Sequence, residues 1–318
     1  MSNQSKIFGG QAVIEGVMFG GNHSQVTAVR RKDGQIETYE LQKASYPWIQ
    51  MLKKIPLLRG LTALIESSAY GAKHMQFASD QYELDHIEEG EKPQAESKLQ
   101  MILGVAIVGI LSLIAGKVIF TGVPAALAHL ILGTNVQSFF IQSLVEGVIK
   151  TLLLFTYLWA ISLTPLIKRV FQYHGAEHKV ITAYENREEL TVENIQRQSR
   201  LHYRCGSSFI ILSVIVGVVL YSFFPFDNIW ERLTNRILLI PVVIGLSYEV
   251  LRATNAMRDI PILKWLGYPG LWLQKLTTKE PTPAQIEVAI VSFNRLLELE
   301  ATSPSAVNNK QKPVVESF

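Results

Sequence analysis

The chain contains very little cysteine and few charged residues. Cys205 is the only cysteine among 318 residues, which excludes an internal disulfide framework. Charged residues make up 18% of the chain, whereas hydrophobic residues make up 48% and the mean hydropathy is +0.19. This balance is untypical of soluble domains and indicates an integral membrane protein. The first ten residues lack the apolar core of a signal peptide, so we expect internal segments to insert into the membrane.

Motifs for binding phosphate or nucleic acid are also lacking. The pairs Gly9-Gly10 and Gly20-Gly21 match neither G-x-x-x-x-G-K-S/T nor G-x-G-x-x-G, and turns are their simplest role. The net charge of +3 is explained by the membrane topology described below, and no nucleic-acid motif is present. Nucleic acid is therefore not an expected partner, whereas the lipid bilayer is.

Residues 1–98 are expected to form a cytoplasmic region with a small antiparallel sheet. Two alternating runs, QVTAVRR and QIETYEL, flank Lys32-Asp33-Gly34, and this pattern predicts a β-hairpin. The earlier run AVIEGVMF predicts one short strand, in which the acid Glu15 needs a partner because its setting is apolar. An apolar stripe from Pro56 onward predicts an amphipathic helix, and the acidic residues 80–98 predict an exposed linker.

Four apolar segments are expected to cross the membrane within residues 99–254, so the predicted fold is a mainly α-helical membrane protein. The predicted spans are residues 99–120, 139–167, 207–226 and 236–254. Lys and Arg crowd the link at residues 168–206, whereas residues 121–138, an expected surface or re-entrant helix, contain neither. The positive-inside rule therefore places the basic link and both termini in the cytoplasm.

Two ionisable residues interrupt the second predicted span. Glu146 and Lys150 are four residues apart and therefore share one helical face. They can neutralise each other inside a helix bundle, or they can line a transport pathway. Both roles are compatible with the sequence.

The segment 255–300 is expected to be cytoplasmic. Residues 261–281 are aromatic and loop-like, and Thr282-Pro283 opens a predicted amphipathic helix that runs through Glu300. We expect this helix to dock onto the cytoplasmic domain. Residues 301–318 lack periodicity, so a disordered tail is predicted there.

The strongest chemical pattern is YHGAEHK at residues 173–179. On a helix, His174 and His178 point the same way, and the carboxylate of Glu177 lies beside them. The order H-x-x-E-H is the one described for inverted zinc peptidases. The turn can therefore offer two metal ligands and a general base, Glu177, with zinc as the favoured divalent metal.

A zinc site needs at least one further ligand, which has to come from elsewhere in the chain. The candidates are His202, Cys205, Glu15 and Glu249. Each has a structural alternative. His202 can be an interfacial side chain, and Cys205 a small buried residue. Arg252, one turn after Glu249, can hold that carboxylate in an ion pair.

Several segments together resemble one known family. They are GGQAVIEGVM, PLLRG, YHGAEHK, RCGSSF, SYEVLR and LWLQKLTTKEPTPAQIEVAI. They closely resemble the YqhQ-like family of multi-pass bacterial membrane proteins, a domain of unknown function whose members are labelled predicted metal-dependent enzymes. The resemblance extends from residue 9 to about residue 299 and implies a protein of the bacterial cytoplasmic membrane. This chain has Ser207 where relatives often have Thr, and Tyr203 where Pro is expected.

Three classes of function remain open on these patterns. The first is a metal-dependent hydrolase at the cytoplasmic membrane face, with Glu177 as its base. The second is a noncatalytic membrane scaffold or accessory factor, which the amphipathic helices favour. The third is a transporter or lipid-handling protein that uses Glu146, Lys150 and Glu249 within the bundle.

Overall fold

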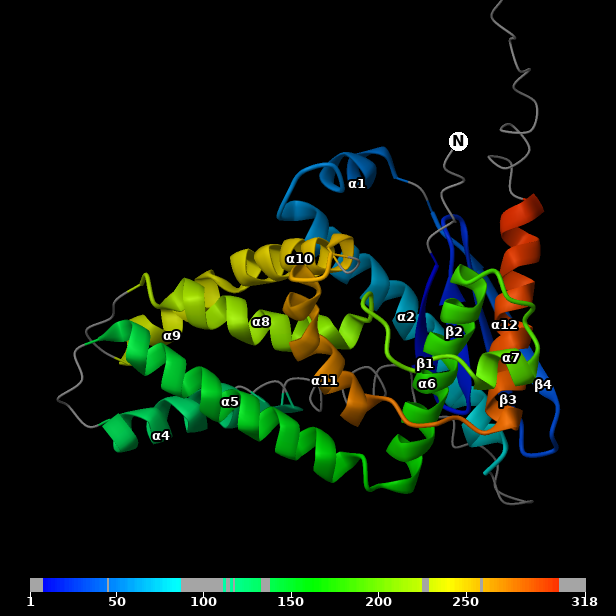
Figure 1. Cartoon of the computed structure of the whole chain (residues 1–318), viewed down its shortest axis with the longest axis horizontal. Coiled ribbons are helices and arrows are strands. Elements are labelled where there is room, and N and C mark those ends of the chain that lie inside the picture. The colour runs from blue at the N-terminus through cyan, green and yellow to red at the C-terminus, as the bar shows by residue number, and fades with distance from the viewer. Residues whose placement is uncertain are drawn as a thin grey trace, which may run out of the picture.

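The computed structural model describes residues 8–44, 46–86, 111–112, 115–116, 118–132, 138–224, 229–257 and 260–302. Strands gather at one end of the molecule, and long helices extend toward the other end (Figure 1). Most of the predicted first span, of the predicted linker and of the predicted tail lies outside the described residues. The predicted class, mainly helical with a small N-terminal sheet, is confirmed.

The N-terminal sheet has four antiparallel strands in chain order. They are β1 Gly9–Val13, β2 Gly16–Gly20, β3 Ser24–Arg30 and β4 Ile36–Gln42. The predicted hairpin is confirmed, since β3 pairs with β4 across a turn in which Gly34 has a φ of +90°, a conformation that favours glycine. The prediction of a single strand over AVIEGVMF is wrong, because the chain reverses there and pairs Val13 with Gly16.

The turn between β1 and β2 contains no Asn-Gly or Asp-Gly pair, and its position depends on close packing against β3. Glu15 occupies this turn with a φ of +54°. A Cβ atom at Gly16 would lie 2.1 Å from the carbonyl oxygen of Ala28 on β3. Only glycine therefore lets β2 start at this position.

The helical elements follow in chain order. They are α1 Pro47–Leu52, α2 Leu58–Leu84, the π-helical turn η1 Val118–Gly122, α4 Val123–Leu132, α5 Phe139–Ile161, α6 Pro165–Glu185, α7 Val192–Gln196, α8 Gly206–Tyr221, α9 Ile229–Leu238, α10 Ile240–Ala256, the 3-10 turn η2 Leu263–Gly267, α11 Tyr268–Thr277 and α12 Pro283–Thr302. The helix predicted from Pro56 is confirmed as α2, but it continues through residues 80–84, which the sequence assigned to a linker. The prediction of a loop at residues 261–281 is wrong, because η2 and α11 form there.

Two predicted spans are divided in the structure. α5 ends at Ile161 and α6 begins at Pro165, so residues 139–167 do not continue as one helix. Proline is tolerated in the first helical turn and disfavours a continuing helix, and Pro241 likewise opens α10 directly after α9. Among the described residues, only α5 is both long and apolar enough to cross a membrane. The four-span topology therefore stays a prediction.

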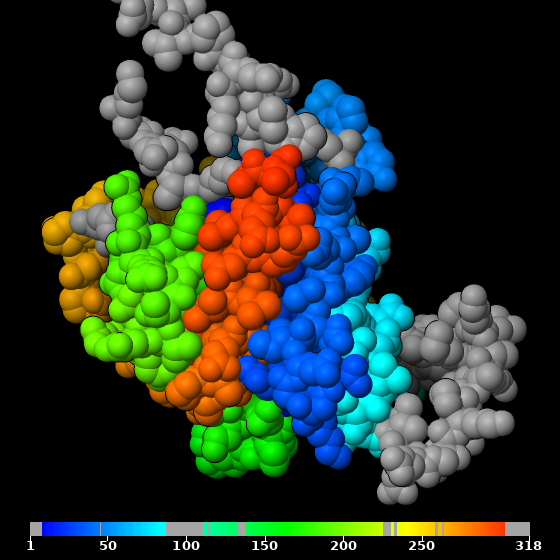
Figure 2. All heavy atoms as spheres, turned by 90° about the vertical axis from the view of Figure 1, so that its right-hand side faces the viewer, coloured from blue at the N-terminus to red at the C-terminus, as the bar shows by residue number. Residues whose placement is uncertain are grey.

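Both faces of the sheet are covered by helices. On one face, Val26 and Ala28 of β3 pack in a cluster with Tyr173 of α6 and Phe293 of α12. On the other face, Val29 packs in a smaller cluster that includes residues of α2. Since alternate residues of a strand point to opposite faces, β3 is buried along nearly its whole length. The predicted docking of the C-terminal helix is confirmed, and Figure 2 shows α12 as an orange-red band beside the blue strands.

Glu146 is buried within the helical part and is paired with an arginine from another helix. The Arg236 guanidinium of α9 donates to both carboxylate oxygens of Glu146 on α5, with an Nη2 to Oε2 distance of 2.6 Å. The same guanidinium lies 5.2 Å from the ring centroid of Tyr221. This pairing joins α5 to α9 through a residue that the spacing of Glu146 and Lys150 did not indicate.

His74 of α2 is fully buried against the sheet. Its Nε2–H donates to Oε1 of Gln25 at 3.2 Å, and its Nδ1 accepts from the Thr27 hydroxyl at 2.7 Å. Burial lowers the pKa of His74 to about 4. The imidazole is therefore neutral in the folded protein at pH values where an unfolded chain would protonate it.

Acidification is expected to destabilise the protein through His74. The unfolded state binds this proton near pH 6.5 and the folded state only near pH 4, so stability is lost as the pH falls through that window. The free energy of unfolding should drop by about 2 kcal/mol between pH 7 and pH 5 from this group. Denaturant unfolding of the wild type and of His74→Asn at both pH values measures the effect.

The His74→Asn variant should show a correspondingly flatter pH dependence. The exposed His86 is the matched control, and His86→Asn should keep the wild-type dependence. Equal pH dependence in the wild type and in His74→Asn would contradict this assignment.

Candidate metal centre

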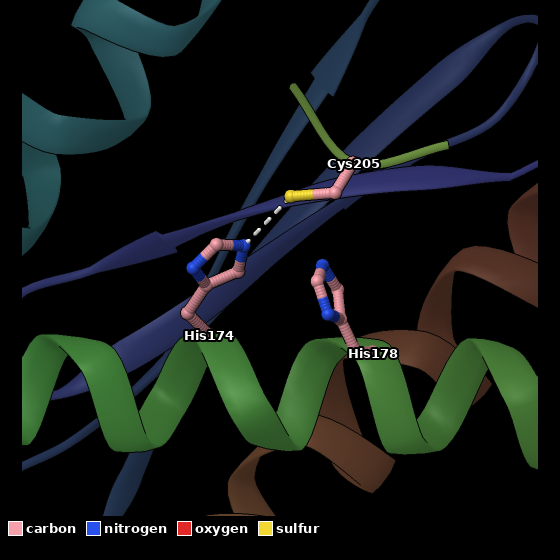
Figure 3. A group of neighbouring side chains, drawn as sticks. All are labelled: His174, His178 and Cys205. Atoms are coloured by element: carbon pink, nitrogen blue, oxygen red, sulfur yellow. Dashed lines mark hydrogen bonds between the residues drawn. The ribbon is translucent and has the colours of Figure 1, made fainter. Parts of the chain in front are cut away.

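Helix α6 carries the central residues of the candidate site. His174 and His178 lie four residues apart on one face of α6, and both rings point toward Cys205 (Figure 3). The adjoining face of the helix is packed tightly. A Cβ atom at Gly175 would lie 2.1 Å from the carbonyl oxygen of Lys279, so the segment before α12 can approach α6 only because glycine stands there. This contact holds α6 in place next to the two histidines.

The two imidazoles are oriented by backbone carbonyl groups. The Nδ1–H of His174 donates to the carbonyl of Thr277 at 2.8 Å, and that of His178 donates to the carbonyl of Arg200 at 2.6 Å. Each ring therefore keeps the lone pair of its Nε2 available. Histidines that bind metals usually have the other ring nitrogen bound in this way.

Cys205 supplies a third candidate ligand at the start of α8. Its Sγ lies 3.2 Å from Nε2 of His174, and it also receives a hydrogen bond from the backbone N–H of Ser207. The nitrogen and sulfur atoms that His174, His178 and Cys205 can offer to a metal all lie within 4.8 Å of one another. The structure thus brings together the predicted histidine pair and one of the four further candidates.

Glu177 is buried beside this cluster. Its Oε2 lies 3.9 Å from Nε2 of His174, and the backbone N–H of Gly10 donates to its carboxylate. Burial raises the pKa of Glu177, although His174, His202 and the Gly10 N–H act in the opposite direction. A carboxyl group with a raised pKa next to potential metal ligands is suited to proton transfer near neutral pH.

The pKa of His178 is shifted in the direction that suits a metal ligand. Burial lowers the pKa of His178, and this effect is opposed by its hydrogen bond with Cys205. A depressed pKa favours the neutral imidazole, which is the form that binds metal ions.

The cluster opens into a cavity of about 340 Å³ between β1, α6 and the start of α8. The lining residues are 8–12, Val170, Phe171, His174, Glu177, His178, Ile181, His202 and 204–207. The contribution of β1 was missed from the sequence, where Gly9 and Gly10 were assigned to a turn. The two glycines could have indicated this role, since glycine also allows the backbone of a strand to lie close to a neighbouring helix.

His202 lines the cavity, but both of its ring nitrogens are engaged away from the cluster. Its Nδ1 accepts from the backbone N–H of Arg204 at 3.3 Å, and its Nε2 lies 3.4 Å from Oε2 of Glu185. The His202 ring centroid is 5.9 Å from that of His178. His202 is therefore a neighbour of the three candidate ligands rather than one of them.

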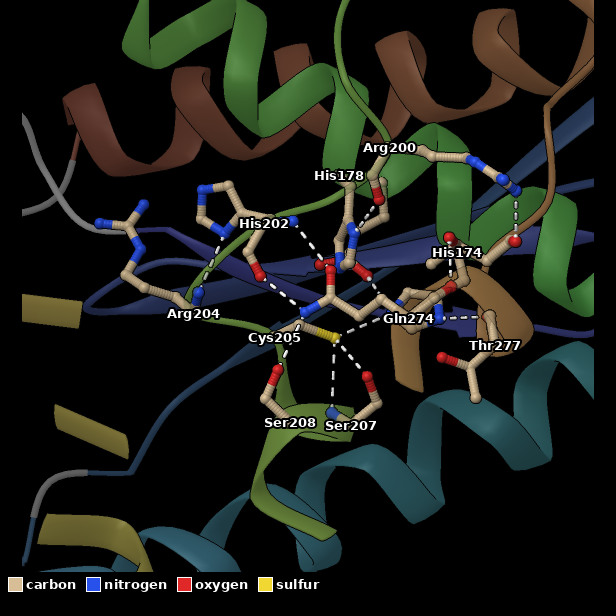
Figure 4. Close-up of polar contacts among 12 residues, drawn as sticks. His174, His178, Arg200, His202, Arg204, Cys205, Ser207, Ser208, Gln274 and Thr277 are labelled. Carbon is tan, nitrogen blue, oxygen red and sulfur yellow. Dashed lines mark hydrogen bonds and ion pairs between the residues drawn. The ribbon is translucent and has the colours of Figure 1, made fainter. Parts of the chain in front are cut away.

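Gln274 of α11 fixes the segment that carries His202 and Cys205, and sequence reasoning missed it. Its fully buried amide accepts from the backbone N–H of His202 and donates to the His202 carbonyl, both at 2.8 Å. The same amide donates to the Ser208 hydroxyl at 2.9 Å (Figure 4). A buried glutamine that makes three hydrogen bonds cannot be replaced by an apolar residue without leaving unpaired groups.

The carboxylates of Glu15 and Glu249 lie outside the cluster because arginines hold them elsewhere. Glu15, in the β1–β2 turn, forms an ion pair with Arg169. Glu249, on α10, accepts from Nε of Arg59 at 2.6 Å and from the backbone N–H of Leu57. The partner of Glu249 thus comes from α2, whereas the sequence pointed to Arg252 in its own helix.

Comparison with known proteins finds one matching family and one similar protein. Residues 55–299 match the family described as "Protein of unknown function (DUF1385)". The chain is 54% identical over 312 residues to a protein of Bacillus subtilis (strain 168) named "Uncharacterized protein YqhQ", with 96% of each chain covered. No solved structure matches the chain. The family resemblance based on the sequence motifs is confirmed, and neither description names a reaction or a ligand.

The two glycines of β1 provide a test of the packing around Glu177. A Cβ atom at Gly10 would lie 2.7 Å from Cγ of Glu177 and 2.8 Å from the Met18 carbonyl oxygen, whereas one at Gly9 would have nothing within 4 Å. Gly10→Ala should lower the free energy of unfolding by about 1–3 kcal/mol, because the added methyl group displaces Glu177 or β2. Denaturant unfolding measures this change. Gly9→Ala is the matched control, and equal effects of the two substitutions would contradict the geometry.

Proposed function

The chain belongs to the family described as Protein of unknown function (DUF1385), and we propose that it is a metal-dependent hydrolase of the bacterial cytoplasmic membrane. The orientation of the two imidazoles carries this proposal. His174 and His178 each donate Nδ1–H to a backbone carbonyl, and each has Nε2 available on the side of Cys205. A buried structural histidine does not need its second ring nitrogen to point toward other potential ligands, whereas a metal-binding histidine does.

The donor set suits zinc. Two imidazole nitrogens and one thiolate are three protein ligands, which leave a fourth position for water or substrate. With Zn–N and Zn–S bonds of about 2.0–2.3 Å, ligand atoms in a tetrahedral site lie about 3.3–3.8 Å apart. The three atoms here lie within 4.8 Å of one another, so modest side-chain movements are sufficient. A zinc ion held there would supply Lewis acidity toward a water molecule or a carbonyl group.

Glu177 is the residue to which we assign proton transfer. It lines the same cavity, and the Gly10 N–H orients its carboxylate. Glu177 would take a proton from the attacking water and deliver it to the leaving group, as expected of a general base that becomes a general acid. Its raised pKa reduces the free-energy difference between these two protonation states near neutral pH.

The exposed surface of the helical part supports a membrane location. α5 has 23 residues, and only 17% of its most apolar 18-residue stretch is buried inside the protein. Its exposed large apolar side chains include Phe140, Ile141, Leu144, Val148, Leu152 and Trp159. Apolar surface of this extent is typical of contact with lipid or a partner. With the basic link at residues 168–206, it leads us to propose four spans with the metal centre and both termini in the cytoplasm.

Metal analysis of the purified full chain tests the proposed centre. The wild type should contain a stoichiometric divalent ion, and His174→Ala, His178→Ala and Cys205→Ser should each lose most of it because a ligand is removed. Elemental mass spectrometry of the detergent-purified proteins gives the stoichiometry. Glu177→Gln is the matched control, since it should keep the metal and lose any hydrolysis that depends on the metal.

His202→Gln should also keep the metal, because His202 stands beside the cluster. Absence of stoichiometric zinc, iron or manganese from the wild-type protein would contradict the proposed metal centre. Retention of metal in all three ligand variants would place the ion elsewhere.

Fusion reporters test the proposed topology. Alkaline phosphatase fused within residues 121–138 should be active, and the same enzyme fused at residue 196 or at the C-terminus should be inactive. Green fluorescent protein at the C-terminus should fluoresce in cells. Active phosphatase at residue 196 would reverse the orientation and place the HGAEH turn outside the cytoplasm.

A further inference from the structure

A second cavity, of about 300 Å³, lies away from the metal centre. It is bordered by α2, by the residue that follows β4 and by the end of α10. Four basic side chains line it: Lys43, Lys53, Arg59 and Arg252. Glu66 is the one carboxylate among its lining residues. The cavity is therefore basic and is suited to an anion.

Two of the four cations form ion pairs, and the other two form none with a described residue. Lys53 forms an ion pair with Glu66, and Arg59 forms one with Glu249. Lys43 donates from Nζ to the carbonyl of Gly21 at 2.7 Å and forms no ion pair with a described residue. Arg252 makes neither a hydrogen bond nor an ion pair within the described ranges. Lys43 and Arg252 are thus the two cations of the cavity that have no ion pair among the described residues, although Glu66 and Glu300 act on Lys43 and Arg252 acts on Glu249 over longer distances.

An exposed apolar helix precedes this cavity in the chain. α1 has no buried residue, and Trp48 and Met51 on it are 62% and 67% exposed. Tyr46 and Ile55, which flank α1, are 52% and 47% exposed. Tryptophan and tyrosine are enriched at the level of lipid headgroups, where an apolar ring with a polar edge is favoured. The set is therefore suited to a membrane interface.

The contacts of α2 place the cavity at one end of a predicted span. A Cβ atom at Gly60 would lie 2.6 Å from Cβ of Tyr248, and one at Gly245 would lie 2.9 Å from the carbonyl oxygen of Leu57. The start of α2 is thus packed directly against the middle of α10, and the cavity-lining Tyr248 and Arg252 follow toward the end that the topology assigns to the cytoplasm. Figure 1 shows α1 and α10 close to the junction between the helical part and the sheet. The basic cavity would then lie at headgroup depth.

We propose that this cavity binds the phosphate of an anionic phospholipid while α1 contacts the adjacent apolar part of the same membrane. Guanidinium and ammonium groups form strong charge-assisted hydrogen bonds with phosphate oxygens. Basic pockets beside membrane spans bind anionic headgroups in this way. The proposal uses the membrane location but is independent of the metal centre, so either can fail without the other.

Titration of the full chain in a nonionic detergent tests the proposal. The ligands are water-soluble dihexanoyl phosphatidylglycerol, dihexanoyl phosphatidylcholine and inorganic phosphate, and native mass spectrometry counts the bound molecules. Phosphatidylglycerol should bind at least tenfold more tightly than the other two. The double variant Lys43→Gln with Arg252→Gln should lose at least tenfold in affinity, because both available cations are removed.

Lys54→Gln is the matched control, since Lys54 is exposed and does not line the cavity. It should bind phosphatidylglycerol like the wild type. If the double variant does not fold, as judged by its circular dichroism spectrum and thermal midpoint, Arg252→Gln alone should still weaken binding. Trp48→Ala should weaken binding of the lipid and leave binding of inorganic phosphate unchanged.

Three results would overturn the proposal. The first is equal affinity in the wild type and in the cavity variants. The second is equal affinity for phosphatidylcholine, which would show that charge is not recognised. The third is inorganic phosphate binding as tightly as phosphatidylglycerol, which would make the cavity a site for the free anion.

Discussion

The candidate centre depends on two hydrogen bonds from imidazole to backbone. His174 is held by the carbonyl of Thr277 at the end of α11, and His178 by that of Arg200 in the segment after α7. Each bond fixes the orientation of a ring and leaves Nε2 as the candidate ligand atom. Because the two carbonyls come from different parts of the chain, the centre forms only when α6, α11 and the α7–α8 segment are assembled. Ligand geometry and tertiary fold are thus coupled.

α6 links the sheet with the helical part. Tyr173 on this helix is buried in the core that α6 and α12 form on the sheet, while the neighbouring His174 faces the cavity and Cys205. Pro165 separates α6 from α5 and gives it a direction of its own. One helix can therefore belong to a rigid core and at the same time present polar side chains at the boundary of the apolar helices. A site held in this way requires little reorganisation to bind a metal.

Sequence reasoning was most successful where local chemistry decides. The β3–β4 hairpin around Gly34 and the C-terminal helix α12 both follow from short-range patterns of turn residues and apolar spacing. It failed where long-range packing decides. The turn at Glu15 depends on the contact between Gly16 and β3, and the partner of Glu249 is an arginine on α2, 190 positions earlier in the chain. Neither relation leaves a periodic signal in the sequence.

By itself, the sequence determined the family, the mainly helical class with an N-terminal sheet, and the spacing that puts His174 and His178 on one helical face, since these depend on residue order and helix geometry. Only the tertiary structure decided which of the further candidates joins them. Cys205 does so because it begins α8 beside α6, whereas arginines hold Glu15 and Glu249 elsewhere. The physical reason is that ligand convergence requires atoms a few ångströms apart in space, and their separation along the chain does not set that distance.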